Sequence, residues 1–272
     1  MAPPTLSPPS SSSSSAPSST ITLEPLTPSS FSPFGTAICS PLPPSLNKVP
    51  SSIPLPQHSP YQPTPVYANQ NSALKTSPIS QFINAYPAGP ESKSRPANPQ
   101  MSMFSCFPRN ISGVGMDVEA AAAAKPIGPR FHVSILERHP FTTQTFSPLG
   151  LAEDDKSTVF LVIVAPSLVD RKAAATRTDT NTNQTVQISN PPDLSRIRAF
   201  VARGDQAVTY APGTWHAPMV VLGQKRVDFL VSQFVNGVPD DDCQEVLLGD
   251  NAVYVDLAPL KSDLGVVAKS KL

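Results

Sequence analysis

Residues 158–165 read T-V-F-L-V-I-V-A, an unbroken apolar run that starts after Ser157 and stops at Pro166. A strand with one wet face would alternate apolar and polar residues. A continuous run of this length is instead typical of a strand that is buried on both faces. The run is far too short to cross a bilayer as a helix. It therefore predicts a central strand with protein core on each side.

Short strand-like segments continue in both directions from this run. Residues 131–136 alternate between two faces, and residues 21–26 alternate in the same way. Residues 27–31 carry cap residues and an early proline, which indicate one or two helical turns that Gly35 ends. Further strand-like segments are 197–201, 206–210, 218–222, 226–235 and 252–257, with Gly, Pro or Asp between them. Many short strands and almost no helix predict a mainly β fold, an antiparallel barrel or sandwich of the jelly-roll type with a few short helices.

The distribution of proline and serine predicts the domain limits. The chain has 272 residues, of which 34 are proline. Residues 1–20 are so rich in Ser and Pro that they cannot bury enough apolar surface to offset their ordering entropy, so we expect a disordered tail. One domain is expected over residues 21–260, followed by a tail over residues 261–272. Flexible loops are expected at 40–66, at 113–129 with a brief helix in the alanine run 120–124, and at 168–192.

Charge and cysteine content argue against several classes of protein. The formal net charge is +0 and no basic stripe is present, so nucleic acid is not an expected partner. No apolar run is long enough for a membrane span, and the first residues lack the pattern of a secretory signal. Cys39, Cys106 and Cys243 are widely spaced without a CxxC pair. This spacing indicates reduced thiols in an intracellular protein.

The last three residues are Ser270, Lys271 and Leu272. This tripeptide at a C-terminus is the signal that the peroxisomal import receptor reads. We therefore expect import into the peroxisome through that receptor, with the cytoplasm as the alternative location.

Two of the four histidines stand in unusual surroundings. His139 directly follows a predicted strand and precedes Pro140, which favours an extended backbone at the histidine. Glu137 lies two residues earlier and so projects from the same face of a strand. His216 follows a Pro-Gly turn that returns the chain at the head of another strand. His58 and His132 lie in a loop and inside a strand and are taken as bystanders.

These two surroundings resemble the paired motifs of the cupin superfamily. Its first motif carries His-x-His, then Glu and Gly, and its second carries Gly-Asp, a tight turn and one His. Glu137 and His139 stand at the His-x-His positions, Gln144 at the Glu position, and His216 at the last His. Two ligand positions are therefore changed. The resemblance implies no certain cofactor and at most a weakly held divalent metal ion, such as nickel or manganese, on these four residues.

One branch of that superfamily, the ureidoglycolate lyases, is more similar still. The similarity covers about residues 21–260, with the polar insertions as extra segments. The motifs that carry it are an opening segment from Leu26 to Gly35, Glu137-Arg138-His139-Pro140, Thr143-Gln144-Thr145-Phe146, Arg198-Ala199-Phe200, Trp215-His216 and Arg226-Val227-Asp228-Phe229.

The resemblance implies a homodimeric enzyme that splits (S)-ureidoglycolate into glyoxylate and urea in allantoin and purine catabolism. His139 or His216 would accept the hydroxyl proton, and the other histidine, Glu137 or a metal ion would assist the leaving urea. Gln144 is a further catalytic candidate. Substrate contacts are expected from Arg138, Arg198, Arg226 and Trp215, with a guanidinium holding the carboxylate.

Plainer roles remain open for most of these residues. Glu137 and Arg138 could form a surface ion pair, Gln144 could bind a loop backbone, and Trp215 could be core. Arg198 and Arg226 could be outward-facing surface residues, with Asp228 fixing Arg226. Two other functions also remain: an amidohydrolase that releases ammonia from the same substrate, and a non-catalytic cupin that binds a small carboxylate.

Overall fold

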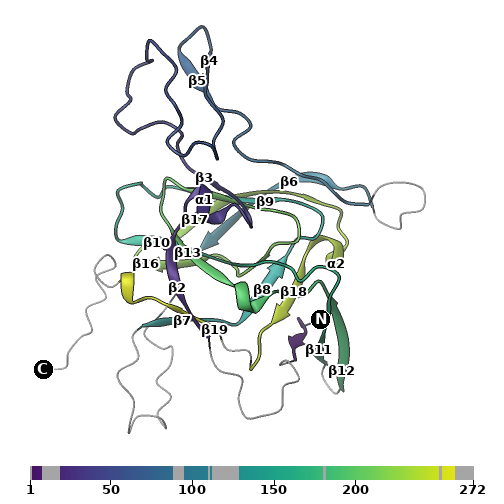
Figure 1. The fold of residues 1–272 in the computed structure, drawn as a ribbon. Helices are drawn as coiled ribbons and strands as arrows, with labels where there is room; N and C mark the ends of the chain where they lie inside the picture. Colours follow the sequence, from purple (N-terminus) through teal and green to yellow (C-terminus); the bar gives the residue numbers. More distant parts are fainter. Residues whose placement is uncertain are drawn as a thin grey trace, which may run out of the picture.

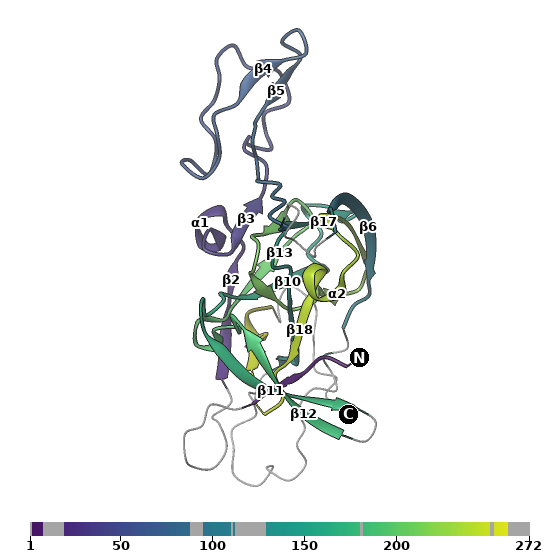
Figure 2. The ribbon, with the colours of Figure 1, turned by 90° about the vertical axis from the view of Figure 1, so that its right-hand side faces the viewer.

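The computed structural model describes residues 2–7, 19–87, 95–109, 111, 129–179, 182–250 and 253–260. Figure 1 shows strongly curved sheets wrapped into a barrel, with very little helix. A long arm leaves the barrel and carries a small hairpin of β4 (Val66–Ala68) and β5 (Ala73–Lys75) at its far end (Figure 2). The predicted mainly β fold with few short helices is confirmed. No helix within the described residues is long and apolar enough to span a membrane.

The larger sheet is built around β10 (Thr158–Ala165), the strand predicted from its apolar run. All eight of its residues are buried. Its neighbours in the sheet are β13 (Arg198–Ala202), β15 (Trp215–His216) and β16 (Val220–Gly223), all antiparallel to it. The sheet continues through β2 (Ser19–Pro25), β19 (Val253–Asp256) and β7 (Arg130–Val133) on one side, and through β8 (Ile135–Arg138), β18 (Gln244–Leu247) and β1 (Thr5–Leu6) on the other.

The smaller sheet has five strands in the order β3-β14-β9-β17-β6. Its middle strand, β9, runs beside β14 and β17, so that residues of three strands form rows across the sheet. The strands are β3 (Gly35–Ile38), β14 (Ala207–Tyr210), β9 (Gln144–Leu149), β17 (Val227–Val235) and β6 (Asn98–Cys106).

The alternation of side chains along β10 explains why it is buried on both faces. Phe160 and Val162 belong to an aromatic-rich cluster shared with the smaller sheet, which includes Phe229. Leu161 and Ile163 point the other way, into a second cluster. Successive residues of a strand face opposite sides of the sheet, so one apolar strand supplies two cores. The functional residues described below lie where the first core ends and polar side chains begin.

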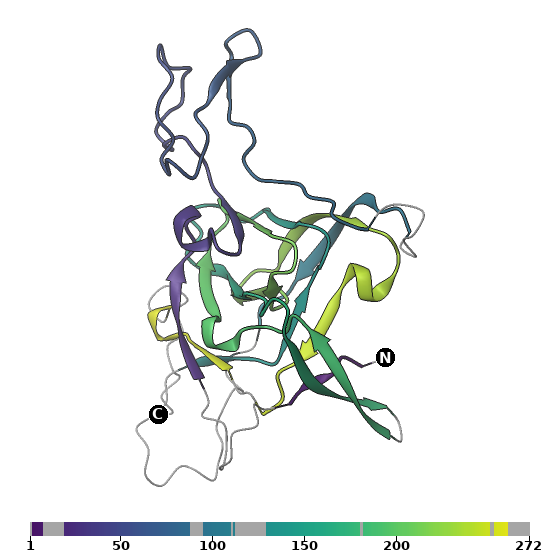
Figure 3. The ribbon, with the colours of Figure 1, turned by 45° about the vertical axis from the view of Figure 1, so that its right-hand side comes forward.

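Two local expectations were wrong. Residues 168–192 were expected to form a loop, but β11 (Lys172–Asp179) and β12 (Thr182–Ser189) pair there as an antiparallel hairpin. Val186 and Ile188 alternate with polar residues along β12, a pattern that suits a paired strand, and their partners on β11 include Ala175, which is fully buried. Residues 5 and 6 lie in the segment expected to be disordered, yet β1 pairs with β11 and β18, and the three strands lie together in Figure 3.

The sheets are also not wholly antiparallel. Strand β2 runs parallel to β13 and to β19, and β1 runs parallel to β18. The helical turns expected after residue 26 are confirmed as α1 (Pro28–Phe31), which begins at a capping box between Thr27 and Ser30. The other short helices are η1 (Leu194–Arg196), α2 (Pro239–Asp242) and η2 (Ala258–Leu260). The alanine run and the tail 261–272, with Ser270, Lys271 and Leu272, lie outside the described residues.

Candidate active site

Strands β8 and β15 bring the two sequence motifs together. His216 pairs with Glu137 in the register of these antiparallel strands, so both side chains leave the sheet on the same face. This face, called the inward face here, looks toward the smaller sheet. His139 follows Glu137 by two residues and joins them. One potential ligand atom from each of Glu137, His139 and His216, a carboxylate oxygen or a ring nitrogen, lies within 4.8 Å of the other two.

The smaller sheet supplies a polar row opposite these residues. Gln144 on β9 is paired in register with Tyr210 on β14 and with Gln233 on β17. Gln144 Nε2 donates a hydrogen bond of 2.6 Å to Gln233 Oε1. The ring of Tyr210 stacks on His216, with centroids 4.0 Å apart and planes 12° apart. The two sheets therefore meet through this stack, and polar groups from both of them share one buried space.

Both histidines are held in the same way. His139 Nδ1 lies 2.5 Å from the carbonyl oxygen of Asp242, and His216 Nδ1 lies 3.0 Å from that of Thr214. A carbonyl only accepts, so each Nδ1 carries the hydrogen and each neutral ring keeps its lone pair on Nε2. Both Nε2 atoms and Gln144 Oε1 are buried and have no hydrogen-bond partner among the described residues. Unpartnered buried polar atoms are rare in folded proteins, and three of them at one place indicate a ligand site.

Burial determines the protonation of His139. Removal from water, together with the charge of His216, lowers the pKa of His139 to about 4, although the Asp242 carbonyl, Glu137 and Gln144 act in the opposite direction. His139 is therefore neutral near pH 7 and can accept a proton at Nε2.

Glu137 is ionised beside these rings. Burial acts to raise the pKa of its carboxyl group, but contact with His216 and the charges of both histidines outweigh burial and leave this pKa below its ordinary value. Glu137 Oε1 lies 3.4 Å from His216 Nε2, a contact that is an ion pair only when His216 is protonated. On its other side, the Cys243 thiol donates to Glu137 Oε2 at 3.9 Å. Burial and the Glu137 charge raise the pKa of Cys243 to about 12, so the thiol stays protonated.

A cavity of about 470 Å³ reaches Glu137 from the surface. Its apolar lining includes Phe146 and Met219, and Arg109 is the cation that borders it. A volume of this size suits a small organic ligand. The cavity thus gives a small anionic molecule a route to Glu137, the carboxylate beside the two histidines. It is also lined by Phe104, Ser105, Cys106, Phe107 and Pro218.

Two of the residues expected to contact substrate lie on the opposite, outward face of the same strands. Arg138 is 5% exposed and donates hydrogen bonds to Gln244 Oε1, Ser167 Oγ and the carbonyl oxygens of Ser189 and Asn190. Its guanidinium lies over the ring of Trp215, 4.8 Å from the centroid. Trp215 is fully buried. Arg138 does not form the surface ion pair with Glu137 that the sequence left open.

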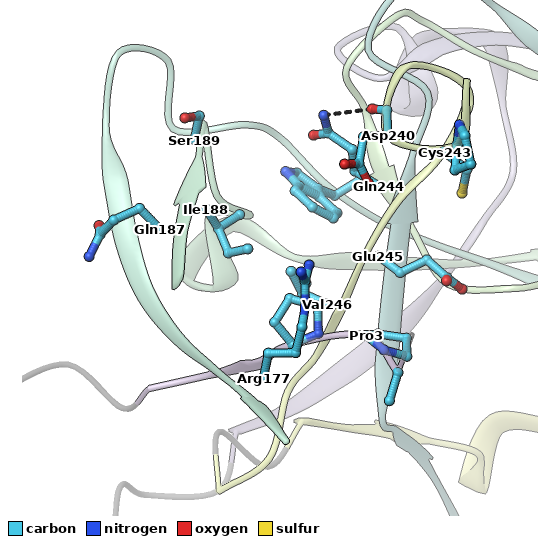
Figure 4. A pocket seen from close by; sticks show the side chains of 14 residues that line it. Pro3, Arg177, Gln187, Ile188, Ser189, Asp240, Cys243, Gln244, Glu245 and Val246 are labelled. Carbon is cyan, nitrogen blue, oxygen red and sulfur yellow. Dashed lines mark hydrogen bonds between the residues drawn. The ribbon is translucent and has the colours of Figure 1, made fainter. Parts of the chain in front are cut away.

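A second cavity lies on this outward side. It has a volume of about 480 Å³ and lies between β1, the β11–β12 hairpin and β18. Figure 4 shows Arg177 and Gln187 on one side of it and Gln244 and Cys243 on the other. The dashed line is the bond of 2.9 Å that Gln244 Nε2 donates to the carbonyl oxygen of Asp240. Trp215 lines this cavity, away from the histidines.

The remaining two predicted arginines lie elsewhere on the barrel. Arg198 forms a bidentate pair with Glu24, donates to the Ser30 carbonyl oxygen at 2.8 Å, and lies over the Phe200 ring. Arg226 pairs with Asp228 at 2.8 Å, as the sequence suggested, and its side chain is 51% exposed. Neither guanidinium is joined to the Glu137 group by a contact in the described part of the chain.

Sequence reasoning missed Tyr210, Gln233 and Arg109. The signal for the first two was the strand register, because Gln144, Tyr210 and Gln233 fall in one row only when β9, β14 and β17 are aligned. Arg109 lies just beyond β6, a strand that the sequence analysis did not predict. Its position beside the cavity depends on that strand.

A curved two-sheet barrel that encloses imidazole and carboxylate groups defines a cupin-like β-barrel enzyme. The sequence profile of the ureidoglycolate lyase family matches residues 18–255, and the chain belongs to that family.

Individual relatives agree with this assignment. The ureidoglycolate lyase of Schizosaccharomyces pombe is 35% identical over 179 residues, which are 66% of this chain and 75% of that protein. The ureidoglycolate lyase of Saccharomyces cerevisiae is 35% identical over 193 residues, 69% of this chain and 80% of that protein. A ureidoglycolate lyase of Burkholderia mallei is 37% identical over 101 residues, 37% of this chain and 42% of that protein.

Proposed function

We propose that this enzyme cleaves ureidoglycolate into glyoxylate and urea. The observation that carries the proposal is the group of Glu137, His139 and His216 in a member of the ureidoglycolate lyase family: two buried histidine Nε2 atoms without a hydrogen-bond partner lie beside a carboxylate that lines a small cavity. The substrate bears a hydroxyl, a carboxylate and a ureido group on one carbon. Its cleavage needs a base, an acid and a cation.

The two histidines differ in a way that suits the two proton transfers. His139 is neutral and its Nε2 is free, so it accepts the hydroxyl proton as the aldehyde carbonyl forms. The C–N bond breaks with its electron pair on the ureido nitrogen. His216 supplies a proton to that nitrogen from Nε2, which requires that its ring enters the reaction as the imidazolium, with the Glu137 carboxylate 3.4 Å from Nε2. No water molecule is consumed.

The carboxylate of the substrate needs a cation near the cavity. Arg109 borders the same cavity as Glu137 and is the arginine we assign to this role. Arg226 lies over the ring of Phe107, which also lines the cavity, and is the second candidate. Arg138 and Arg198, the other expected candidates, already hold protein oxygens. Arg109→Ala should raise KM about tenfold or more, the scale of one hydrogen bond to a charged group, whereas the exposed Arg196→Ala should not.

The residues also fit a divalent metal ion. The fit rests on the free Nε2 atoms of His139 and His216, each fixed through Nδ1 as in metal sites, and on the nearby Glu137 carboxylate. These three groups would hold the ion, with Gln144 Oε1 completing the set, and it would add Lewis acidity at a substrate oxygen. A neutral amide is a poor ligand, so we propose weak binding of nickel or manganese. Chelator-treated protein should keep part of its activity, and full loss with rescue by one ion would contradict this.

Product analysis tests the reaction. In ¹⁸O-labelled water the enzyme should release one urea per glyoxylate, with no label in the urea and no ammonia. Labelled carbon dioxide with free ammonia would establish the amidohydrolase instead. Tight glyoxylate binding without turnover would establish a non-catalytic cupin.

We also propose a homodimer that pairs through β6. This strand is at the edge of the smaller sheet, carries no charged residue, and exposes Met101 by 73% and Met103 by 53%. Light scattering of the purified protein should give twice the chain mass, and Met103→Lys should give the monomer. Peroxisomal import through Ser270, Lys271 and Leu272 stays a prediction. Loss of punctate fluorescence on deletion of Leu272 would test it.

A further inference from the structure

The hydroxyl of Tyr210 is buried without a hydrogen-bond partner. The side chain is 2% exposed, and its oxygen contacts no donor or acceptor among the described residues. Buried tyrosine hydroxyls usually find a partner, because an unsatisfied polar atom destabilises the folded state. The hydroxyl thus lowers the stability of the folded state, which indicates that it has a role other than a structural one.

Tyr210 lies inside the group of polar residues described above. The Tyr210 ring stacks on the His216 ring, and Tyr210 is the register partner of Gln144. A phenol hydroxyl can donate a hydrogen bond, and Glu137 Oε1 lies 3.4 Å from Nε2 of the His216 ring on which Tyr210 stacks. Tyr210 therefore offers a hydrogen-bond donor beside the group of Glu137, His139 and His216.

The chemistry of the substrate indicates which group would accept this hydrogen bond. A carboxylate near Tyr210 would be repelled by the ionised Glu137, whereas a neutral carbonyl would not. The ureido carbonyl is one bond removed from the departing nitrogen. His216, which we assign to that nitrogen, is the residue on which Tyr210 stacks. The substrate thus places its ureido carbonyl beside Tyr210 when its nitrogen faces His216.

We propose that the Tyr210 hydroxyl donates a hydrogen bond to the ureido carbonyl oxygen of the substrate and stabilises the leaving group. The inference rests on the proposed function. As the C–N bond breaks, its electron pair moves to the ureido nitrogen and is shared with the carbonyl oxygen. Tyr210 stabilises the charge on that oxygen and keeps its own proton, while the nitrogen receives one from His216. The hydroxyl acts in the way an oxyanion hole does, on the leaving group instead of the attacked carbonyl.

The substitution Tyr210→Phe tests the role with little change in packing, because the ring that stacks on His216 remains. We expect kcat/KM for ureidoglycolate to fall about 100- to 1,000-fold, the usual effect of removing one preorganised donor. The thermal midpoint should stay the same or rise, because the variant lacks an unsatisfied buried hydroxyl. A structural role for the hydroxyl would instead lower the midpoint. Tyr254→Phe, on β19 beside His132, is the matched control and should leave both values unchanged.

Inhibition separates this role from a general disturbance of the site. Oxalurate carries a ureido and a carboxylate group, whereas oxalate carries carboxylates alone. Tyr210→Phe should raise the Ki of oxalurate about three- to tenfold, as expected for one hydrogen bond, and leave the Ki of oxalate unchanged. Equal effects on both inhibitors, or full turnover by the variant, would overturn the assignment. An inactive wild-type protein would refute the proposed function itself and is thereby distinguished from failure of the Tyr210 assignment.

Discussion

The inward and outward faces of β8 and β15 have opposite chemistry, although their residues are neighbours in the sequence. On the inward face, Glu137 and His216 lie beside buried atoms that have no partner. On the outward face, Arg138 has four protein acceptors and Trp215 donates from Nε1 to the carbonyl oxygen of Asn190 at 2.9 Å. One face is thus prepared for a ligand, and the other holds the barrel together.

The difference shows that a motif can join two unrelated tasks. In Glu137-Arg138 and in Trp215-His216, one residue of each pair (Glu137, His216) lies on the inward face. The other (Arg138, Trp215) faces the β11–β12 hairpin or the core. Alternation along a strand requires this separation. On the inward face, the histidine Nε2 atoms and Gln144 Oε1 have no partner, as expected where a ligand completes a polar network, since a network that is left incomplete destabilises the fold.

The largest expected effect belongs to the inward face. His216→Ala and His139→Ala should each lower kcat by about 10²- to 10⁴-fold, the range for loss of one acid–base group. The fold should remain, because each ring makes a single hydrogen bond to the protein through Nδ1. Turnover at saturating substrate and circular dichroism give the two values. His132→Ala on β7 is the control, and full activity of His216→Ala would show that the inward face is not the reaction centre.

The outward face should respond in stability instead. Arg138→Met keeps much of the packing over Trp215 but removes the guanidinium donor from the carbonyl oxygens of Ser189 and Asn190, of which Asn190 keeps its bond from Trp215 Nε1. We expect the free energy of unfolding to fall by about 2–4 kcal/mol, since bonds to a buried charged group are lost. Denaturant titration measures the change, and Arg196→Met, on the exposed residue of η1, should be nearly neutral.

Kinetic measurements on the same variant test whether Arg138 contacts the substrate or only stabilises the outward face. The folded fraction of Arg138→Met should keep its KM for ureidoglycolate. A KM that rises tenfold while stability is unchanged would place Arg138 on the substrate, as the sequence resemblance implies.

Strands and helices whose conformation depends on the local sequence pattern could be predicted from the sequence. The apolar run of β10 and the cap residues of α1 each determine their own conformation. The β11–β12 hairpin was not predicted, because its apolar face is limited to Ala173, Ala175, Val186 and Ile188 among polar residues, and β11 also pairs with β1, a strand that lies far away in the sequence. The long edge strand β6 was missed for a related reason, since its regular pairing is supplied by β17.

The site was predictable in part. The resemblance named Glu137, His139, Gln144 and His216, which the fold brings together across 79 residues of sequence (216 minus 137). Tyr210 could not be predicted as a site residue, because a tyrosine at the end of a strand is expected to be a core residue until the register of β9 and β14 is known. Likewise, nothing in the sequence separates Arg138 from a substrate-binding arginine until its acceptors on β12 and β18 are in place.

The smallest effect is expected at Ser167, which connects the two faces. Its hydroxyl accepts from Arg138 at 3.2 Å and donates to the Gly213 carbonyl oxygen at 2.7 Å, while Gly213 N donates to the His139 carbonyl oxygen at 2.8 Å. Ser167→Ala should lower the free energy of unfolding by about 1 kcal/mol, because Arg138 keeps its other acceptors and only the Gly213 oxygen loses its donor.

The kcat of Ser167→Ala then shows whether the outward hydrogen-bond network affects catalysis on the inward face. The turn that carries His216 is also held by the bond of 3.1 Å from Thr214 N to the Ala211 carbonyl oxygen and by the bond of 3.0 Å from the Thr214 hydroxyl to that of Phe34. These bonds do not involve Ser167, so kcat should stay close to that of the wild type. A fall in kcat comparable to that of His139→Ala would mean that the outward network positions His139 through Gly213, and the division of tasks between the two faces would have to be abandoned.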